Sequence, residues 1–321
     1  MKALVARELS GPAGLEYTDV DDVGGDDAVV VDVGAAGVSF PDLLLLRGEY
    51  QMRLEPPFIP GMEVAGVVRS APYDSEFKAG QRVTALAMLG GWAEQVAVPP
   101  QNLTPTPDDL DDAGAVALLG NYQTMYFALA KRGALRHGET VLVLGSAGGV
   151  GTAAVQIAKA LGAKVIAMVH RPNAMDFVRS LGADVVLPLT DGWLEAVKQH
   201  NDGRGVDLVV DPIGGDAFDD AIRALDTEGR LLVIGFAAGG IPTVKVNRLL
   251  LRNVSVVGVG YGEYVNRKPG SQSVFAFGVE QLVKSGLRPP PPMRFPLSEG
   301  RAALQFLADG GVFGKLVLEP R

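Results

Sequence analysis

The sequence predicts an α/β protein in which a β-rich N-terminal domain precedes a doubly wound parallel sheet. Short apolar runs separated by Gly and Pro fill the first third of the 321-residue chain, whereas apolar strands and helix-like segments alternate from residue 139 to residue 259. Such alternation indicates a parallel sheet with helices on both faces. A chain of this length is also long for one hydrophobic core, so two domains are expected.

The first 121 residues have the pattern of a small, irregular β-barrel or sandwich. An acidic and then apolar segment at 108–119 predicts a connecting helix, which continues over 121–135. The strands of this region are expected at 29–33, 64–68, 82–86 and 92–98.

The second part of the chain predicts six strands, which fit the doubly wound order with a ligand across their carboxyl ends. The strands are expected at 141–144, 164–169, 184–187, 206–210, 230–234 and 254–259, and the helices between them at 150–161, 174–181, 193–200 and 216–225. A helix at 279–285, a stiff extended linker at 289–292, a helix at 302–307 and a strand at 315–318 follow. Because the parallel sheet is already complete, we expect this tail to return to the first domain.

Composition excludes several classes of protein. No window approaches the roughly 18 uncharged apolar residues of a membrane span. The N-terminus reaches Arg7 and Glu8 too early for a signal peptide, so a cytoplasmic location is expected. The net charge of −8, without a basic block, argues against a nucleic-acid partner.

The chain offers few ligands to a metal. It has no cysteine, which excludes disulfides, a thiol nucleophile, an iron–sulfur cluster and a thiolate zinc site. Its three histidines, His137, His170 and His200, are never four residues apart. A tight transition-metal site is therefore not expected.

A glycine turn joins the first strand of the parallel sheet to its helix. Gly145, Gly148 and Gly151 recur every three residues, and Ser146 stands where a strict G-x-G-x-x-G has its first glycine. Such a turn leaves backbone N–H groups at a helix N-terminus, a site for the pyrophosphate of a dinucleotide. The alternative is a tight strand–helix crossover without a nucleotide. The turn residues predicted to bind the cofactor are Ser146, Ala147, Gly148, Gly149 and Val150.

The end of the next strand indicates which dinucleotide binds. NAD sites usually have an acid about twenty residues after the turn, which binds the ribose 2′-OH. Here the strand ends in Val169, His170 and Arg171, with no acid to repel a 2′-phosphate. Arg171 could pair with that phosphate, so the sequence predicts NADPH, with His170 as a weaker contact. The alternative is that Arg171 is a solvated loop residue and NADH is accepted.

Several motifs together resemble the zinc-free quinone oxidoreductase branch of the medium-chain dehydrogenase/reductase superfamily. The resemblance implies a GroES-like catalytic domain over 1–121 and 261–321, a Rossmann NADPH-binding domain over 122–260, and usually a homodimer, which we expect to form through the exposed edge of the sheet. The motifs are GMEVAG (61–66), FKAGQRV (77–83), GGWAE (90–94), residues 144–158, DPIGG (211–215) and GFAAGGIPT (235–243).

Two departures from the zinc-dependent relatives bear on the chemistry. Ser39 stands where those relatives have a cysteine, and Met62 stands in their G-H-E motif. A hydroxyl and a thioether do not replace thiolate and imidazole as catalytic zinc ligands. The resemblance therefore implies hydride delivery by the nicotinamide alone, to an electron-poor acceptor such as a quinone or an enone.

The resemblance also implies site residues. Tyr50 matches a tyrosine that related enoyl reductases place near the substrate carbonyl, where a phenol can donate a proton; the alternative is that it only lines the pocket. Ser39, Tyr261 and Tyr264 are predicted to lie in the substrate pocket, although simple packing explains the two tyrosines equally well. Lys315 is predicted to reach the ribose or a phosphate, or else to be a surface lysine. The other predicted cofactor contacts are Asn121, Thr124, Gly214, Gly235, Phe236 and Gly260.

Three functions remain open. The first is an NADPH-dependent quinone or enone reductase. The second is an enoyl-thioester reductase of lipid or polyketide metabolism, which would need basic residues for a CoA or carrier-protein arm. The third is a non-catalytic NADPH-binding protein.

Overall fold

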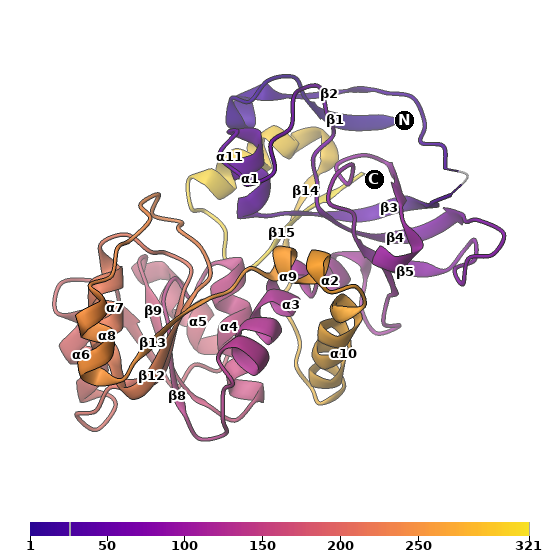
Figure 1. Ribbon diagram of the computed structural model, residues 1–321. Helices are drawn as coiled ribbons and strands as arrows, with labels where there is room; N and C mark the ends of the chain where they lie inside the picture. Colours follow the sequence, from indigo (N-terminus) through magenta and orange to yellow (C-terminus); the bar gives the residue numbers. More distant parts are fainter. Residues whose placement is uncertain (26, 321) are drawn as a thin grey trace. The chain divides into compact units, whose positions relative to one another are not determined.

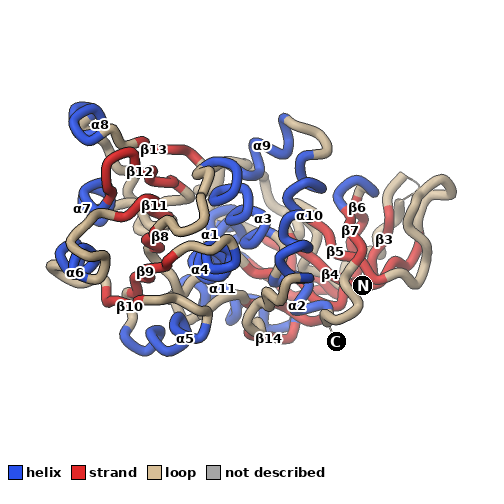
Figure 2. The backbone as a smooth tube through the Cα atoms, turned by 90° about the horizontal axis from the view of Figure 1, so that it is seen from below, coloured by secondary structure: helices blue, strands red, loops and turns tan. Residues whose placement is uncertain are grey.

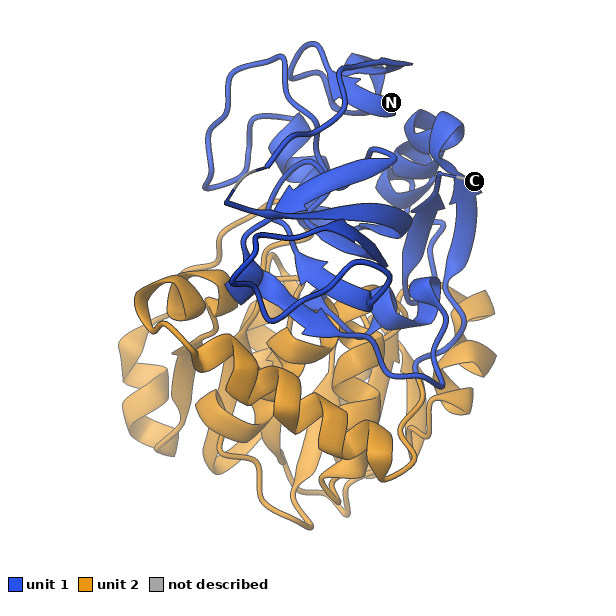
Figure 3. Ribbon diagram, turned by 90° about the vertical axis from the view of Figure 1, so that its right-hand side faces the viewer, with its two compact units in different colours: residues 1–120, 289–321 blue, residues 121–288 orange. Residues whose placement is uncertain are grey.

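The computed structural model describes residues 1–25 and 27–320, which divide into two compact units. Unit 1 comprises Met1–Gly120 and Pro289–Arg321, and unit 2 comprises Asn121–Arg288 (Figure 3). We expected residues 261–288 in the first domain, but they belong to unit 2. The reason is aromatic packing: Tyr261 and Phe275 both lie against Phe127, with ring centroids 5.9 and 5.1 Å away.

Unit 1 is built on a mainly antiparallel sheet (Figure 1). In the described residues its order is β14-β15-β3-β4-β5-β7, and β6 also pairs with β3. The C-terminal strand β15 pairs antiparallel with β3, which confirms that the tail returns to the first domain. The elements are β1 (Lys2–Ala6), β2 (Leu15–Asp19), β3 (Val29–Val38), α1 (Phe40–Leu46), β4 (Glu63–Ser70), β5 (Arg82–Leu86), β6 (Gln95–Val98), β7 (Leu103–Pro105), α2 (Asp112–Ala117), β14 (Met293–Pro296), α11 (Gly300–Ala308) and β15 (Leu316–Glu319).

Helix α1 begins directly after Ser39, one of the predicted pocket residues. The residues at its N-terminus explain why this helix forms. Ser39 is the N-cap residue and Asp42 is the third helical residue, so that both partners of a capping box are present. The backbone N–H and the hydroxyl of Ser39 donate to Asp42 Oδ2 at 2.9 and 2.7 Å. Four consecutive leucines follow, and their lack of periodicity left this helix unpredicted.

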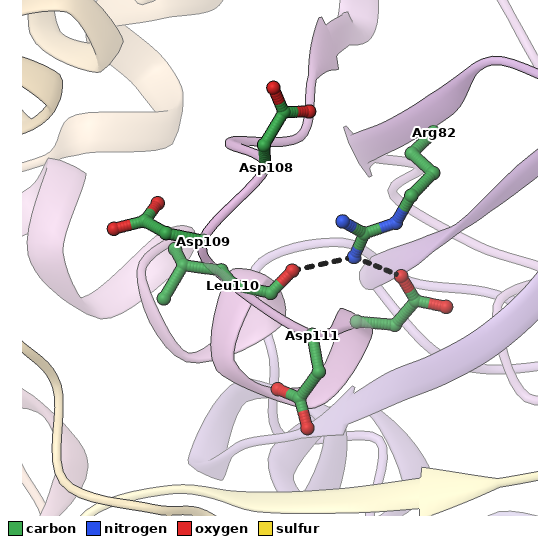
Figure 4. A pocket seen from close by; sticks show the side chains of 6 residues that line it. Arg82, Asp108, Asp109, Leu110 and Asp111 are labelled. Atoms are coloured by element: carbon green, nitrogen blue, oxygen red, sulfur yellow. Dashed lines mark hydrogen bonds and ion pairs between the residues drawn. The ribbon is translucent and has the colours of Figure 1, made fainter.

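Arg82 fixes the connection between β7 and α2. Its guanidinium Nη2 donates to the Leu110 carbonyl at 2.7 Å and to Asp112 Oδ1 at 2.9 Å, beside a shallow pocket rimmed by further aspartates (Figure 4). A Cβ on Gly34 would lie 1.9 Å from Asp112 Oδ2, so the glycine lets α2 approach β3. Arg82 on β5 and Asp112 at the start of α2 therefore tie the helix to the sheet.

Unit 2 contains the predicted parallel sheet (Figure 2). Among the described residues the order is β10-β9-β8-β11-β12-β13, the doubly wound order, and all five pairings are parallel. The elements are α3 (Gly120–Tyr126), a π-helix (Phe127–Arg132), β8 (Thr140–Val143), α4 (Gly149–Ala160), β9 (Lys164–Val169), α5 (Met175–Ser180), β10 (Val185–Pro188), α6 (Trp193–Gln199), β11 (Val206–Asp211), α7 (Ala217–Ala224), β12 (Leu225–Val233), α8 (Val246–Arg252), β13 (Ser255–Gly258), α9 (Tyr261–Arg267) and α10 (Ser271–Lys284).

Fully buried apolar side chains form the core of each unit. The side chains of Leu142 and Ile166 on β8 and β9 are fully buried in unit 2, as are Val31 and Trp92 in unit 1. The indole N–H of Trp92 donates to the Gly37 carbonyl at 2.9 Å, which satisfies the one polar atom of that side chain. None of the helices in residues 1–25 and 27–320 is long and apolar enough to cross a membrane.

Candidate active site

The glycine turn of unit 2 allows the backbone of α4 to contact the backbone at the end of β8 directly. Gly145 has a φ of +60°, a conformation that favours glycine. A Cβ on Gly151 would lie 2.2 Å from the Gly145 carbonyl oxygen and 2.6 Å from the Ser146 Cα. Because both obstacles are backbone atoms, only glycine fits at position 151.

Gly148 differs from these two glycines because the fold does not require it. Its φ is −76°, and a Cβ there would lie at an ordinary 3.6 Å from the Gly145 carbonyl oxygen. It is exposed at the N-terminus of the twelve-residue helix α4. The first-turn N–H groups of Gly149, Val150 and Gly151 have no carbonyl four residues earlier within the helix to accept them. An exposed helix N-terminus without a side chain over it suits a pyrophosphate.

Ser146 serves the turn itself. Its hydroxyl donates to the Val143 carbonyl at 2.8 Å, and its backbone N–H donates to the Met168 carbonyl at 3.0 Å. Both of its donors are therefore used within unit 2, and Ala147 beside it is buried. A cofactor contact of these two residues remains a prediction.

The end of β9 lies at the same edge of the sheet as the turn, because β9 is the parallel neighbour of β8. Val169 is buried, His170 is exposed and Arg171 is half-buried. Burial lowers the pKa of the Arg171 guanidinium, which nevertheless keeps its charge at neutral pH. This edge thus presents a cation, and no acid, where β9 ends.

Asp211 shapes the same edge at the end of β11; the sequence motif DPIGG contains it, but the motif predicted no role for it. Its Oδ1 accepts the N–H groups of Ile213 and Gly214, both at 2.9 Å, and Gly214 has a φ of +64°. Gly214 approaches Phe236, since a Cβ there would lie 3.1 Å from the Phe236 ring. The sequence signal that could have indicated this role is a single acidic residue between an apolar strand and Pro212. Gly214, Gly235 and Phe236 are thereby brought to one edge, that of β11 and β12.

The two predicted pocket tyrosines of α9 take part in an aromatic cluster of unit 2. Tyr261 is buried, and its hydroxyl donates to Gln123 Oε1 at 2.6 Å. The ring of Tyr264 lies 4.9 Å from that of Phe127. Packing therefore accounts for both side chains, and a role in lining an acceptor pocket stays a prediction. Asn121 and Thr124 are half-buried on α3, and Gly260 is the N-cap residue of α9.

In unit 1, Tyr50 lies in the field of a buried carboxylate. Asp42 is fully buried, and its Oδ1 has no hydrogen-bond partner among the described residues. Burial raises the pKa of Asp42 to about 6, the Ser39 hydrogen bond opposes this rise, and the charge of Glu63 adds to it. Burial, and then the charge of Asp42, raise the pKa of the half-buried Tyr50 phenol. The phenol is protonated at neutral pH, as that of an unperturbed tyrosine also is.

Lys315 is buried and not exposed as a surface lysine would be. Only 5% of the residue is accessible, and its ammonium forms an ion pair with the Glu63 carboxylate, which is 6% accessible. The sequence analysis did not single out Glu63, although it is the remaining acid of the motif in which Met62 replaces histidine. Its position beside a lost metal ligand was the signal that could have found it.

The donor set of unit 1 does not suit a catalytic zinc ion. The Ser39 hydroxyl is bonded to Asp42, and Met62 supplies only a thioether. In the described part of the chain, no group of three or more His, Asp or Glu side chains is arranged to hold a metal ion. We derive no chemical step from a metal.

Asp42 gives the stability of the protein a specific pH dependence. Its pKa rises from 3.8 to about 6 on folding, so the folded state binds more protons than the unfolded state in this range and stability falls as pH rises. We expect the unfolding free energy of the wild type, relative to Asp42→Asn, to fall by about 2 kcal/mol between roughly pH 4 and pH 7. Urea unfolding of both proteins across this range measures the difference. Parallel pH profiles would show that Asp42 titrates normally.

Known proteins resemble this chain over its whole length. Residues 25–108 match the alcohol dehydrogenase GroES-like domain, and residues 149–275 match the family described as zinc-binding dehydrogenase. Quinone oxidoreductase-like protein 2 of Bos taurus is 38% identical over 82% of this chain and 76% of its own length. A probable oxidoreductase from Mycobacterium abscessus is 60% identical, covers 100% of this chain and 99% of its own, and superposes with a TM-score of 0.93.

The structures of a third relative include a bound cofactor. The quinone oxidoreductase from Thermus thermophilus, whose structures include a complex with NADPH, is 38% identical, covers 99% of this chain and 100% of its own, and superposes with a TM-score of 0.84. These matches confirm the resemblance found in the sequence motifs, and with it the GroES-like and Rossmann-type architecture. The chain is an enzyme that belongs to the quinone oxidoreductase branch of the medium-chain dehydrogenase/reductase superfamily.

Proposed function

We propose that this enzyme uses NADPH to deliver a hydride to a quinone or an α,β-unsaturated carbonyl compound, without a metal ion. The observation that carries the proposal is the edge of the sheet in unit 2. There the glycine-opened N-terminus of α4 and the cation of Arg171 follow two neighbouring parallel strands. The NADPH complex of the Thermus relative supports the choice of cofactor.

Each group at this edge suits one part of NADPH. The first N–H groups of α4 would donate hydrogen bonds to the pyrophosphate, since Gly148 places no side chain over them. Arg171 would form charge-assisted hydrogen bonds with the 2′-phosphate, which no neighbouring acid repels. Gly214, Gly235, Phe236 and Gly260 would supply backbone and apolar contacts. Asn121 and Thr124 on α3 would contact the nicotinamide half.

Tyr50 would complete the reaction with an enone. When bound, NADPH supplies the hydride, and addition of hydride to the β-carbon leaves negative charge on the carbonyl oxygen. The Tyr50 phenol, which is protonated at neutral pH, would donate a hydrogen bond to this oxygen and then its proton. A reduced quinone needs less help, because water can protonate it.

A second copy of this chain would bind at the open edge of the parallel sheet. β13 is the last strand of the sheet in the described residues, and α8, which leads into it, exposes Val246, Leu250 and Leu251 by 73–77%. An unpaired strand beside an apolar helix suits a symmetric interface. Sedimentation velocity would show a dimer for the wild type and a monomer for Leu250→Asp. Identical sedimentation of the two proteins would refute this interface.

The proposed reaction predicts NADPH oxidation with particular acceptors. We expect loss of NADPH absorbance with 9,10-phenanthrenequinone and with a short 2-alkenal, because both accept a hydride at an electron-poor carbon or oxygen. Turnover of crotonyl-CoA in preference to both would point to an enoyl-thioester reductase. Tight NADPH binding without turnover of any acceptor would point to a non-catalytic protein.

Replacing Arg171 tests the recognition of the 2′-phosphate. A charge-assisted hydrogen bond contributes about 1.5–3 kcal/mol, so we expect Arg171→Ala to raise the KM for NADPH roughly 10- to 100-fold and to leave the KM for NADH unchanged. Steady-state kinetics with each cofactor measure this difference. Arg179→Ala, which removes an exposed arginine paired with Asp176 on α5, is the matched control. Equal effects on both cofactors would count against the assignment.

Replacing Tyr50 tests the proton donor. Tyr50→Phe removes only the hydroxyl, and we expect it to lower kcat on an enone by about 10²-fold or more, with a smaller loss on a quinone. A primary isotope effect with deuterated NADPH checks that hydride transfer limits the rate. Tyr73→Phe, at a fully exposed tyrosine of the same unit, is the control. An unchanged kcat on the enone, with hydride transfer limiting, would reduce Tyr50 to a lining residue.

A further inference from the structure

The most deeply buried opposite charges that we find in unit 1 face each other. Glu63 is the first residue of β4, and Lys315 immediately precedes β15; both are at least nine-tenths buried and form an ion pair. Two charges removed from water are strongly unfavourable unless each compensates the other. Removing either charge would therefore leave the other one buried and uncompensated, which destabilises the folded state.

Two glycines enclose the carboxylate of this pair. A Cβ on Gly37 would lie 2.6 Å from Glu63 Oε2 and 3.1 Å from Lys315 Cε, and a Cβ on Gly120 would lie 2.0 Å from Glu63 Oε1. Neither glycine has a positive φ, so space and not backbone conformation explains their presence. Each carboxylate oxygen of Glu63 thus lies directly against a glycine, Oε2 against Gly37 and Oε1 against Gly120.

The backbone that Glu63 touches leads into residues of the proposed site. Gly37 lies near the end of β3, two residues before Ser39, and its carbonyl accepts the indole N–H of Trp92 at 2.9 Å. Gly120 is the first residue of α3 and directly precedes Asn121. One side chain of unit 1 therefore fixes the backbone at Gly37 and at Gly120.

We infer that Glu63 and Lys315 form a positioning pair, in which Lys315 is the counter-ion of Glu63 and not a ligand of the cofactor. Glu63 holds the backbone of unit 1 at Gly37 and Gly120, from which the chain continues to Ser39 and to Asn121, and Lys315 compensates the buried charge of Glu63. The inference rests on the proposed function, because it assigns the pair to the site that would bind NADPH and the acceptor. It replaces the expectation that Lys315 contacts a ribose or a phosphate.

A double-mutant cycle separates the two roles of Lys315. The variants are Glu63→Gln, Lys315→Met and their combination, which keep size and remove one or both charges. We expect each single variant, measured well below its Tm, to raise the Kd for NADPH and the KM for the acceptor by at least about tenfold, because one buried charge is left unpaired. The double variant should return to within about threefold of the wild type. The control is a second double-mutant cycle with Lys2→Met and Asp19→Asn, at an exposed ion pair of the same unit. Its variants should leave the Kd for NADPH and the KM for the acceptor unchanged.

Several outcomes would overturn the inference. If Lys315→Met weakens NADPH binding equally with and without Glu63→Gln, then Lys315 is a cofactor ligand. If the folded single variants bind NADPH and turn over like the wild type, then the pair is merely structural. Should the single variants not fold, Gly120→Ala tests the same idea with both charges in place. That variant should raise the Kd for NADPH by displacing Glu63 Oε1, and an unchanged Kd would refute the positioning role.

The cycle also distinguishes a failure of the pair from a failure of the proposed function. If the wild type does not bind NADPH, the proposed cofactor is wrong, and the claim that Glu63 positions its site falls with it. The Tm values of the four proteins still decide whether Lys315 is the counter-ion of Glu63. Additive Tm losses would show that the two charges do not depend on each other.

Discussion

The contact between the first turn of α4 and the end of β8 is the constraint on which the nucleotide edge depends. Because residue 151 has no Cβ, the helix starts directly beside the Gly145 carbonyl and its dipole points at the carboxyl edge of the sheet. The ends of β9, β11 and β12 share this edge by parallel pairing. Arg171, the Asp211 turn and Phe236 are therefore assembled by one helix–strand approach and by the sheet order.

Several buried polar groups of unit 1 form hydrogen bonds or ion pairs with one another. Ser39 donates to Asp42, and Lys315 neutralises Glu63. In the proposed reaction, reduction of an acceptor depends on the hydride donor and on a group that can release a proton. We propose Tyr50 for that second role; its phenol is protonated at neutral pH, as that of an unperturbed tyrosine is.

Regular patterns made most of the fold predictable. Alternating strands and helices predicted the parallel sheet and its order. Because a further strand followed the six strands of that sheet, the C-terminal segment was expected to return to the first domain. Elements without a clear period were missed, such as α1 with its run of leucines and α8 with an apolar side exposed to solvent. The place of residues 261–288 depends on aromatic contacts with Phe127, which are distant in sequence and invisible to local patterns. For the same reason, the sequence indicated the glycine turn and Arg171 but not the pairing of Lys315 with Glu63, which are 252 residues apart.

The central claim is that hydride passes directly from NADPH to a carbon of the acceptor in an enzyme that needs no metal. NADPH deuterated in turn at each C4 position, incubated with an enone in the presence of a strong chelator, tests this claim most directly by mass spectrometry of the product. The account predicts one deuterium on the β-carbon from one of the two labelled forms only, at a rate that the chelator does not change. Product without deuterium from either form, or a rate abolished by the chelator and restored by zinc, would contradict it.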